Sequence, residues 1–249
     1  MTAAPFAGDS CSVPFSVRGD TPTRHAALIA QAQCLRIDVA KRSWAVYRPG
    51  DLEALWQQMG EADFGPDERI PYWVELWPAS LLLVEWLDRC RDRIQGKACL
   101  DVGCGLGLSA CVAADAGARV VGLDYIQDAL HYARANTEGN EVSFSPLWVQ
   151  MDWRWPGLKP RCFDLIWGAD IFYEKRFAKP LMRLFEHVLA PGGRVWLAEP
   201  ERSVSSGAWE LLREYGWEVR RATRKAVPTE GYTVNINIWE AQKNEVEHG

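Results

Sequence analysis

The sequence predicts an α/β fold, in which a doubly wound, seven-stranded and mostly parallel sheet has an antiparallel terminal strand and follows an N-terminal β-hairpin extension. From residue 78 onward, short apolar runs alternate with segments whose apolar residues recur at helical spacing. Such alternation is typical of a parallel sheet with helices on both faces. The last two apolar runs have no helix between them, and their loop is too short for a parallel crossover. At least one terminal strand is therefore expected to be antiparallel.

The composition is that of a globular protein with one main domain. The chain has 249 residues, of which 48% are hydrophobic and 24% charged, enough to bury a full core. No apolar stretch approaches the ~20 residues that a membrane-spanning helix needs, and the start shows no cationic segment followed by an apolar one. We therefore expect a cytoplasmic monomer that does not contact a membrane.

Charge and cysteine usage exclude two further classes of partner. The chain has 28 Lys and Arg against 33 Asp and Glu, and its basic residues form no long run. We therefore expect no nucleic-acid partner. Seven cysteines include no C-x-x-C pair, which favours reduced core thiols and argues against a metal site.

The first 70 residues are predicted to be an extension of the main domain. Residues 1–34 lack sustained periodicity and are expected to form a flexible tail. Residues 35–39 and 44–47 are rich in strand-forming residues and predict the hairpin. Asp51 is placed to cap a short helix that runs to Met59. We expect the hairpin and this helix, residues 35–70, to cover the functional site.

The main domain is predicted to span residues 71–241, followed by a C-terminal tail, 242–249. Strands are predicted at 98–102, 119–123, 147–151, 163–167, 194–198, 217–223 and 233–240. A first helix, with apolar residues at helical spacing from Leu83 to Ile94, is predicted to run up to Gly96. Further helices are predicted at 108–116, 127–138, 178–189 and 204–215.

A glycine-rich turn after the first main-domain strand predicts a nucleoside site. Asp101 lies at the end of that strand, and Gly103, Gly105 and Gly107 lie in the turn before the next helix. Glycine permits a tight turn and a close backbone approach to a ligand. Asp124 ends the second strand, where a carboxylate can accept hydrogen bonds from both ribose hydroxyls.

The kind of nucleoside follows from two departures from other nucleotide motifs. The dinucleotide motif requires Gly or Ala where this chain has Leu108, and no phosphate-binding P-loop motif occurs. Asp101 would repel a pyrophosphate but suits a ligand with a cationic amino group, such as the methionine end of S-adenosylmethionine.

The run from Asp101 to Gly107 resembles the first motif, D/E-x-G-x-G-x-G, of the class I S-adenosylmethionine-dependent methyltransferases. The resemblance covers about residues 71–240 and implies a Rossmann-like fold with S-adenosylmethionine as cofactor. By this resemblance Asp124 holds the ribose and Asp152 contacts the adenine. The residues expected to contact the cofactor are Trp77, Asp101, Gly103, Gly105, Gly107, Asp124, Tyr125, Asp152, Trp153 and Ala169.

A second motif follows the fourth main-domain strand. The segment Gly168-Ala-Asp-Ile-Phe-Tyr173 lies at the carboxyl edge of the predicted sheet, where open α/β folds bind ligands. Its Asp170-x-x-Tyr173, together with Pro71-Tyr-Trp-Val-Glu-Leu-Trp-Pro-Ala79, resembles family-16 type methyltransferases. That group includes lysine methyltransferases of the electron-transfer flavoprotein β-subunit and bacterial predicted nicotinamide N-methylases. From the residues alone, Asp170 is equally well explained as a helix N-cap with Phe172 and Tyr173 in the core.

The resemblance implies that Asp170 and Tyr173 are catalytic residues in the acceptor site. Trp73, Glu75 and Phe172 are expected to contact the substrate, although Glu75 is equally well explained by a local ion pair. Aromatic side chains here would desolvate the acceptor amine.

Other transferase subclasses fit the sequence less well. Base amino-methyltransferases carry two prolines after the Asn or Asp that aligns with Asp170, whereas this chain has Ile171 and Phe172. No Pro-Cys nucleophile for cytosine C5 chemistry occurs. The sequence therefore favours an N-methyltransferase that acts on lysine side chains of a protein. A small amine or pyridine acceptor is the first alternative, and a non-catalytic S-adenosylmethionine-binding interaction protein is the second. A pocket sealed by residues 35–47 would favour a small acceptor, and an open one would favour lysine.

Overall fold

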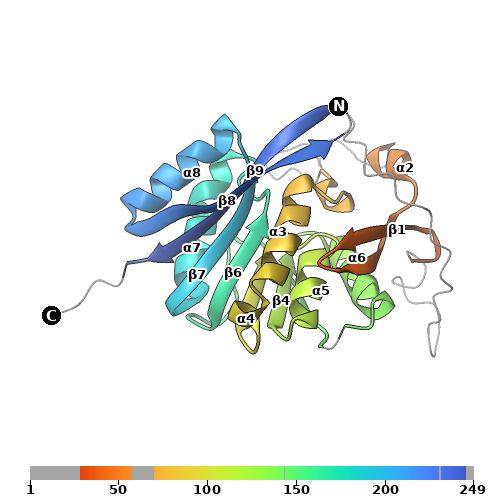
Figure 1. Cartoon of the computed structure of the whole chain (residues 1–249), viewed down its shortest axis with the longest axis horizontal. Coiled ribbons are helices and arrows are strands. Elements are labelled where there is room, and N and C mark those ends of the chain that lie inside the picture. The colour runs from red at the N-terminus through yellow and green to blue at the C-terminus, as the bar shows by residue number, and fades with distance from the viewer. Residues whose placement is uncertain (1–28, 58–69, 143, 230, 245–249) are drawn as a thin grey trace.

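The computed structural model describes residues 29–57, 70–142, 144–229 and 231–244. Most of the predicted N-terminal tail, the end of the predicted helix at Met59 and most of the predicted C-terminal tail lie outside these residues. Within the described part, the chain forms a two-stranded hairpin and a seven-stranded sheet with the strand order β5-β4-β3-β6-β7-β9-β8 (Figure 1).

The strands of the large sheet are β3 (Ala98–Val102), β4 (Arg119–Asp124), β5 (Leu147–Gln150), β6 (Phe163–Ala169), β7 (Leu189–Pro200), β8 (Trp217–Thr229) and β9 (Tyr232–Lys243). Strands β3 to β7 are parallel. Strand β9 is antiparallel to both β7 and β8. The predicted α/β class and strand number are confirmed, and the antiparallel strand lies one position in from the edge of the sheet.

The helices are α2 (Leu52–Gln57), α3 (Pro78–Arg89), α4 (Arg91–Ile94), α5 (Leu108–Asp115), α6 (Gln127–Gly139), α7 (Ala178–Val188) and α8 (Ser203–Glu214), with short 3-10 turns η2 (Tyr72–Val74) and η3 (Lys175–Phe177). The prediction of one helix that runs up to Gly96 is wrong, because the structure has two helices here and α4 ends at Ile94. Helix α3 begins at Pro78, because proline fits the first turn of a helix, and Cys90 separates it from α4.

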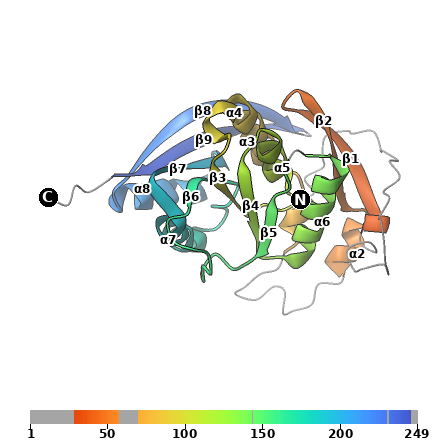
Figure 2. The same cartoon turned by 90° about the horizontal axis from the view of Figure 1, so that it is seen from below.

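Helices cover both faces of the sheet (Figure 2). Helices α3 and α5 pack on one face through a cluster that includes Leu83, Leu87 and Ala113. On the other face, α7 and α8 contribute Phe185 and Trp209 to a second cluster. This double covering explains why the parallel strands were recognisable as short, continuous apolar runs.

Strands β1 (Ala32–Val39) and β2 (Arg42–Pro49) form the predicted hairpin, in which β2 packs on α6 and β1 contacts α3. The Asn136 side chain accepts the Tyr47 backbone N–H and donates to the carbonyls of Tyr47 and Leu106. Asn140 exchanges hydrogen bonds with the backbone of Ala45. Because Leu106 belongs to the glycine-rich turn, Asn136 connects the hairpin directly to that turn.

A buried acid connects the antiparallel strand to its neighbours. Glu240 in β9 accepts hydrogen bonds from Arg93, Arg194, Arg220 and the indole of Trp196. Burial alone would raise the pKa of Glu240, but these bonds outweigh it and lower the pKa to about 2.

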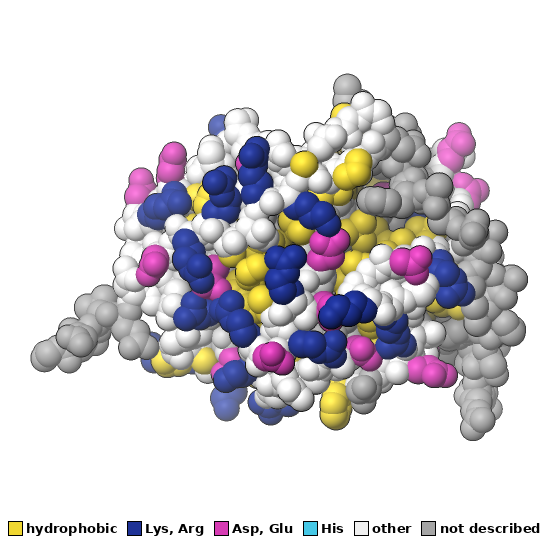
Figure 3. Space-filling view, in the orientation of Figure 1, with side chains coloured by type: hydrophobic (Ala, Val, Ile, Leu, Met, Phe, Trp, Pro, Cys, Tyr) yellow, Lys and Arg dark blue, Asp and Glu magenta, His cyan; other side chains and the backbone are white. Residues whose placement is uncertain are grey.

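In Figure 3, basic side chains on the visible face of the molecule are interspersed with acidic ones.

Two smaller features concern the whole of the described chain. None of its helices combines the length and apolar character needed to cross a membrane. Its six described cysteines are free thiols, and five of them are buried, which agrees with the predicted reduced core thiols.

Replacing Glu240 with Gln should destabilise the protein by roughly 3 kcal/mol at pH 7, because the three arginines lose their common counter-charge. The folded-state pKa is lower than that of the unfolded chain, so the ionised acid stabilises the fold above about pH 4.5 and progressively less as the pH falls towards about 2. Urea unfolding of the parent and of Glu240→Gln at pH 7, 5 and 3 measures this. The difference in free energy of unfolding between the parent and Glu240→Gln should be constant down to about pH 5 and then shrink.

The control is Glu186→Gln, which removes a surface ion pair to Lys243 and should cost no more than about 1 kcal/mol. Equal stability of Glu240→Gln and the parent at pH 7 would contradict the claim that ionised Glu240 stabilises the fold.

Candidate functional site

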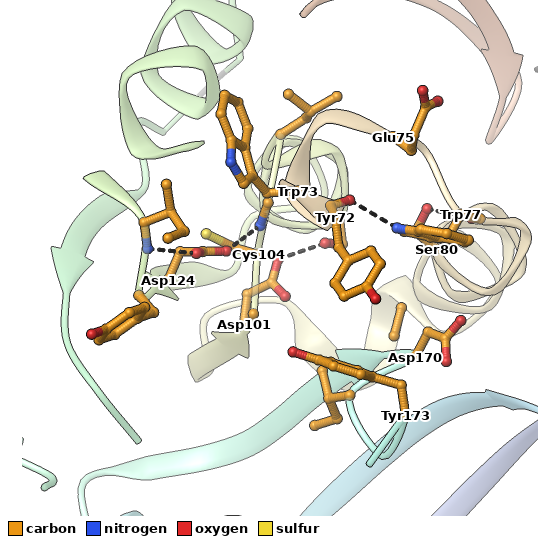
Figure 4. A pocket seen from close by; sticks show the side chains of 18 of the residues that line it. Tyr72, Trp73, Glu75, Trp77, Ser80, Asp101, Cys104, Asp124, Asp170 and Tyr173 are labelled. Carbon is orange, nitrogen blue, oxygen red and sulfur yellow. Dashed lines mark hydrogen bonds between the residues drawn. The ribbon is translucent and has the colours of Figure 1, made fainter. Parts of the chain in front are cut away.

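Four neighbouring strands of the parallel sheet carry an acidic side chain at their carboxyl ends. Asp101 is the last residue but one of β3, Asp124 ends β4, Asp170 follows β6 directly, and Glu199 lies near the end of β7. The carboxyl ends of parallel strands meet at one edge, where open α/β sheets bind ligands. A pocket lies at this edge, and the first three acids line it (Figure 4).

Asp101 and Asp124 are both buried and are held by donors of the glycine-rich turn and its neighbours. The Ser109 hydroxyl donates to Asp101 at 2.5 Å, and burial raises the pKa of Asp101 to about 7 despite this bond. Asp124 accepts the backbone N–H groups of Gly105 and Ile126, each at 2.9 Å. Burial also raises the pKa of Asp124. Asp124 lines the pocket with this carboxylate.

The turn itself depends on glycine. Gly103, Gly105 and Gly107 all have positive φ. A Cβ at Gly107 would lie 2.7 Å from the side chains of Ala133 and Trp148, so no larger residue fits there. The close packing seats the turn against α6 and β5 and exposes its backbone to the pocket.

Asp170 occupies a left-handed backbone conformation, with φ of 54°. Its N–H donates to the Ala198 carbonyl at 2.8 Å, and its Oδ2 accepts from Arg202 at 2.8 Å. Its Oδ1 is buried and has no hydrogen-bond partner among the described residues. Burial raises the pKa of Asp170, and the Arg202 guanidinium opposes this shift. Left-handed conformations are uncommon outside glycine and concentrate at functional sites.

Aromatic rings form another wall of the pocket. The Tyr72 ring contacts Tyr173 and Trp77 edge-on, with centroids 5.5 and 6.1 Å apart. The Trp77 indole donates to the Tyr72 carbonyl at 2.9 Å. In the view of Figure 4 the two tyrosine rings lie between Asp101 and Asp170.

This combination of groups fits one class of ligand. Buried carboxylates beside an open glycine turn can accept ribose hydroxyls and an ammonium group. They would repel the diphosphate of a dinucleotide. The donor set therefore fits S-adenosylmethionine.

Comparison with known proteins agrees with this reading. Residues 100–197 match the profile of a family described as "Methyltransferase domain". The chain is 26% identical over 123 residues to the ubiquinone biosynthesis O-methyltransferase of Idiomarina loihiensis, covering 49% of each protein. It is 27% identical over 177 residues to EEF1A lysine methyltransferase 3 of Mus musculus, covering 69% of this chain and 72% of that protein. The chain thus spans about half the length of the first relative.

A solved structure shares the fold. The magnesium protoporphyrin IX methyltransferase of Synechocystis PCC 6803, crystallised with bound SAM, superposes with a TM-score of 0.53 and 21% identity over 66% of this chain and 77% of that one. Residues 100–197 of this chain therefore match a methyltransferase domain, and the chain shares the fold of a solved methyltransferase.

Most of the predicted site residues line the pocket at the carboxyl edge of the sheet. They are Trp73, Glu75, Trp77, Asp101, Gly103, Gly105, Gly107, Asp124, Tyr125, Asp152, Trp153, Ala169, Asp170 and Tyr173. Asp152 is additionally paired with Arg154, which lowers the pKa of Asp152 although burial opposes the shift.

The prediction for Phe172 is wrong. Phe172 is 2% exposed and packs edge-on against Trp209 of α8, so it belongs to the core. The left-handed turn at Asp170 directs the chain inward at this point. The alternative explanation of Asp170 as a helix N-cap is also wrong, because Glu174 precedes the 3-10 turn η3 and Phe177 precedes α7.

Glu75 lines the pocket but is already paired. Its carboxylate accepts from Arg48 of β2 at 2.7 Å, and Arg48 also donates to Gln33 of β1. Burial raises the pKa of Glu75, and the charge and hydrogen bond of Arg48 oppose this. The ion pair therefore attaches the aromatic segment, residues 71–77, to the hairpin.

Three residues near the pocket were not predicted. Tyr72 directly precedes the predicted Trp73, and its aromatic character was a usable signal. Glu199 lies near the carboxyl end of a strand, as the other acids do, so its position could have indicated it. Arg202 reaches Asp170 from 32 positions further along the chain, and no sequence spacing indicates that contact.

Replacing Arg48 with Gln should loosen the aromatic segment. A hydrogen bond between charged groups contributes about 1.5–3 kcal/mol, so backbone amides of Val74 and Glu75 should exchange with solvent roughly tenfold faster or more. Hydrogen exchange resolved to single residues measures this. The control is Arg36→Gln in the neighbouring strand, whose exposed side chain reaches Ser43. Unchanged exchange in Arg48→Gln would show that the ion pair does not hold the segment.

Proposed function

We propose that this protein methylates lysine side chains of a protein substrate, with S-adenosylmethionine as the methyl donor. The observation that carries the proposal is the buried, unpartnered Oδ1 of Asp170 in a pocket walled by Tyr72, Trp77 and Tyr173. Such an oxygen suits an N–H donor from an acceptor amine. The similarity to EEF1A lysine methyltransferase 3 supports the same class of acceptor.

The cofactor residues act through hydrogen bonds and charge. Asp124, fixed by two backbone N–H groups, accepts hydrogen bonds from the ribose hydroxyls. Asp101 accepts a hydrogen bond from the ammonium group at the methionine end of the cofactor. Asp152, Trp153 and Tyr125 surround the adenine. When bound, the cofactor supplies a methyl group that is electrophilic because it is attached to a sulfonium.

The acceptor residues orient a neutral amine. A free lysine has a pKa near 10.4, so removing its proton at pH 7 costs roughly 4–5 kcal/mol. Desolvation by Tyr72, Trp77 and Tyr173 lowers this cost. Asp170 accepts an N–H of the amine and so points the lone pair of the amine nitrogen at the methyl group. Burial raises the pKa of Tyr173, so its hydroxyl remains protonated and its ring faces the product ammonium.

The shape of the pocket favours lysine over a small acceptor. No described residue of the hairpin lines it, and Tyr72 and Tyr125 at its border are 40% and 38% exposed. A side chain with a long aliphatic stem fits such an opening. The expectation that residues 35–70 cover the site stays a prediction. The described hairpin packs on α3 and α6, Ile70 lines the pocket, and residues 58–69 lie outside the described part of the chain.

The test is incubation with radiolabelled S-adenosylmethionine and an extract of cells that lack the protein. Label should enter a protein band and be recovered on lysine after digestion and mass spectrometry. Heat-treated enzyme is the control. Label confined to small molecules would establish the small-acceptor alternative, and no transfer in any fraction would establish the non-catalytic one.

Cofactor affinity should depend on the ionisation of Asp101. Because its pKa is about 7 in the free protein, and only the ionised form pairs with the ammonium, affinity for S-adenosylhomocysteine should fall up to about tenfold per pH unit below pH 7. Calorimetric titration between pH 5.5 and 8 measures it. Asp101→Asn should abolish the slope, and Asp152→Asn, which removes an acid already ionised in this range, should keep it. Affinity independent of pH in the parent would contradict the role of Asp101.

Asp170→Asn should separate transfer from cofactor binding. The variant keeps the size of the side chain but loses its charge, so the amine is misoriented and methyl transfer should fall about 10²-fold or more. The dissociation constant for S-adenosylhomocysteine should stay within about threefold of the parent. Tyr173→Phe should reduce methyl transfer less than Asp170→Asn does, because the aromatic ring remains. Recovery of the Asp170→Asn deficit at high cofactor concentration would instead make Asp170 a cofactor ligand.

A further inference from the structure

Glu199 lies behind Asp170 and supports its turn. One Glu199 oxygen, Oε1, accepts the backbone N–H groups of Ile171 and Phe172 at 2.9 and 3.1 Å. These are the two residues that follow Asp170, and the Asp170 N–H itself is bound by the carbonyl of Ala198, next to Glu199. The side chain of Glu199 therefore holds the left-handed turn from its inner side.

The cluster contains two buried carboxyl groups and one guanidinium. Glu199 is 2% exposed, and Asp170 has an 8% exposed side chain. Arg202 is paired with Asp170 through one oxygen. Two negative charges against one positive charge would leave a net buried charge, which is costly because burial removes the hydration of the carboxylates.

The groups that face Glu199 from other elements leave this imbalance in place. Across the sheet, its partner in the register is the neutral Asn237 of β9. The next acid along, Glu201, turns away to pair with Arg224 of β8 and accepts from Asn237. The charges that act most strongly on Glu199 are those of Asp170 and Arg202.

We infer that Glu199 is a positioning residue that holds the Asp170 turn and carries a proton at neutral pH, so that Asp170, Glu199 and Arg202 together bear no net charge. Burial and the nearby Asp170 charge raise the pKa of Glu199 to about 8, even though its two backbone hydrogen bonds act the other way. This inference rests on the proposed function, because Glu199 acts on the acceptor only through Asp170.

The neutral cluster resolves a conflict in the acceptor site. A carboxylate next to an amine stabilises the ammonium form and so opposes methyl transfer. With Arg202 balancing Asp170 and Glu199 protonated, Asp170 accepts an N–H without imposing a net negative charge. Once Glu199 ionises, the site gains a negative charge and holds the bound amine in its unreactive, protonated form.

The first test measures stability and needs no acceptor. The folded-state pKa of Glu199 exceeds that of the unfolded chain, so the parent loses stability as the pH rises from about 4.5 to about 8. Glu199→Gln mimics the protonated acid, and its melting temperature relative to the parent should rise steadily from pH 5 to pH 8.5. Glu201 is the next acid along the chain and is exposed. For Glu201→Gln, the difference in melting temperature from the parent should stay constant over this pH range. A constant difference for Glu199→Gln would overturn the inference and leave the proposed function intact.

The second test uses the acceptor protein identified by the labelling experiment. The ratio of kcat for Glu199→Gln to kcat for the parent cancels the titration of the acceptor itself, and it should rise at least threefold between pH 7 and pH 9. Glu199→Ala loses both backbone hydrogen bonds and should be at least tenfold slower than Glu199→Gln at pH 7. A ratio independent of pH would reduce Glu199 to a structural role.

A third measurement uses the parent alone, in case the variants do not fold. Carbon-13 labelling of glutamate carboxyl groups separates Glu199 from the buried Asp101, which also titrates near neutral pH. One glutamate signal should titrate near pH 8. Glutamate signals that all titrate below pH 6 would contradict the inference.

Discussion

The burial of acidic side chains at one edge of a parallel sheet is the constraint on which the rest of this structure depends. Each acid loses its hydration and needs donors in return, and the local chain geometry provides them. The glycine turn directs a backbone N–H at Asp124, Ser109 at the start of α5 satisfies Asp101, and the segment before α8 brings Arg202 to Asp170. The left-handed turn after β6 is in turn fixed by Glu199.

The donors also divide the edge into two chemically distinct parts. Near the glycine turn, backbone and hydroxyl donors leave Asp101 and Asp124 able to accept further hydrogen bonds from a cationic, ribose-containing cofactor. Around Asp170, a guanidinium balances the charge and leaves one oxygen without a partner. The fold is shared by methyltransferases with unrelated acceptors, so the second part of the edge, rather than the fold, carries the information about the substrate.

The sequence predicts the sheet well, because short apolar runs and helical periodicity are local patterns. The sequence also brings Asp101, the glycines and Asp124 to one edge, because they belong to a single strand–turn–helix–strand unit, and all of them line the pocket. Phe172 was misplaced because nothing local shows that Asp170 adopts a left-handed conformation. The contacts of Arg202 with Asp170 and of Arg48 with Glu75 join residues 32 and 27 positions apart, and only the packed structure brings them together.

A crystal structure of the complex with S-adenosylhomocysteine tests the central claim most directly, namely that the acidic edge binds the cofactor on one side and presents Asp170 to the acceptor on the other. The account predicts both ribose hydroxyls on Asp124, the amino group on Asp101, and the sulfur facing the space bounded by Asp170, Tyr72 and Tyr173. A ribose bound away from Asp124, or a sulfur facing away from Asp170, would contradict it.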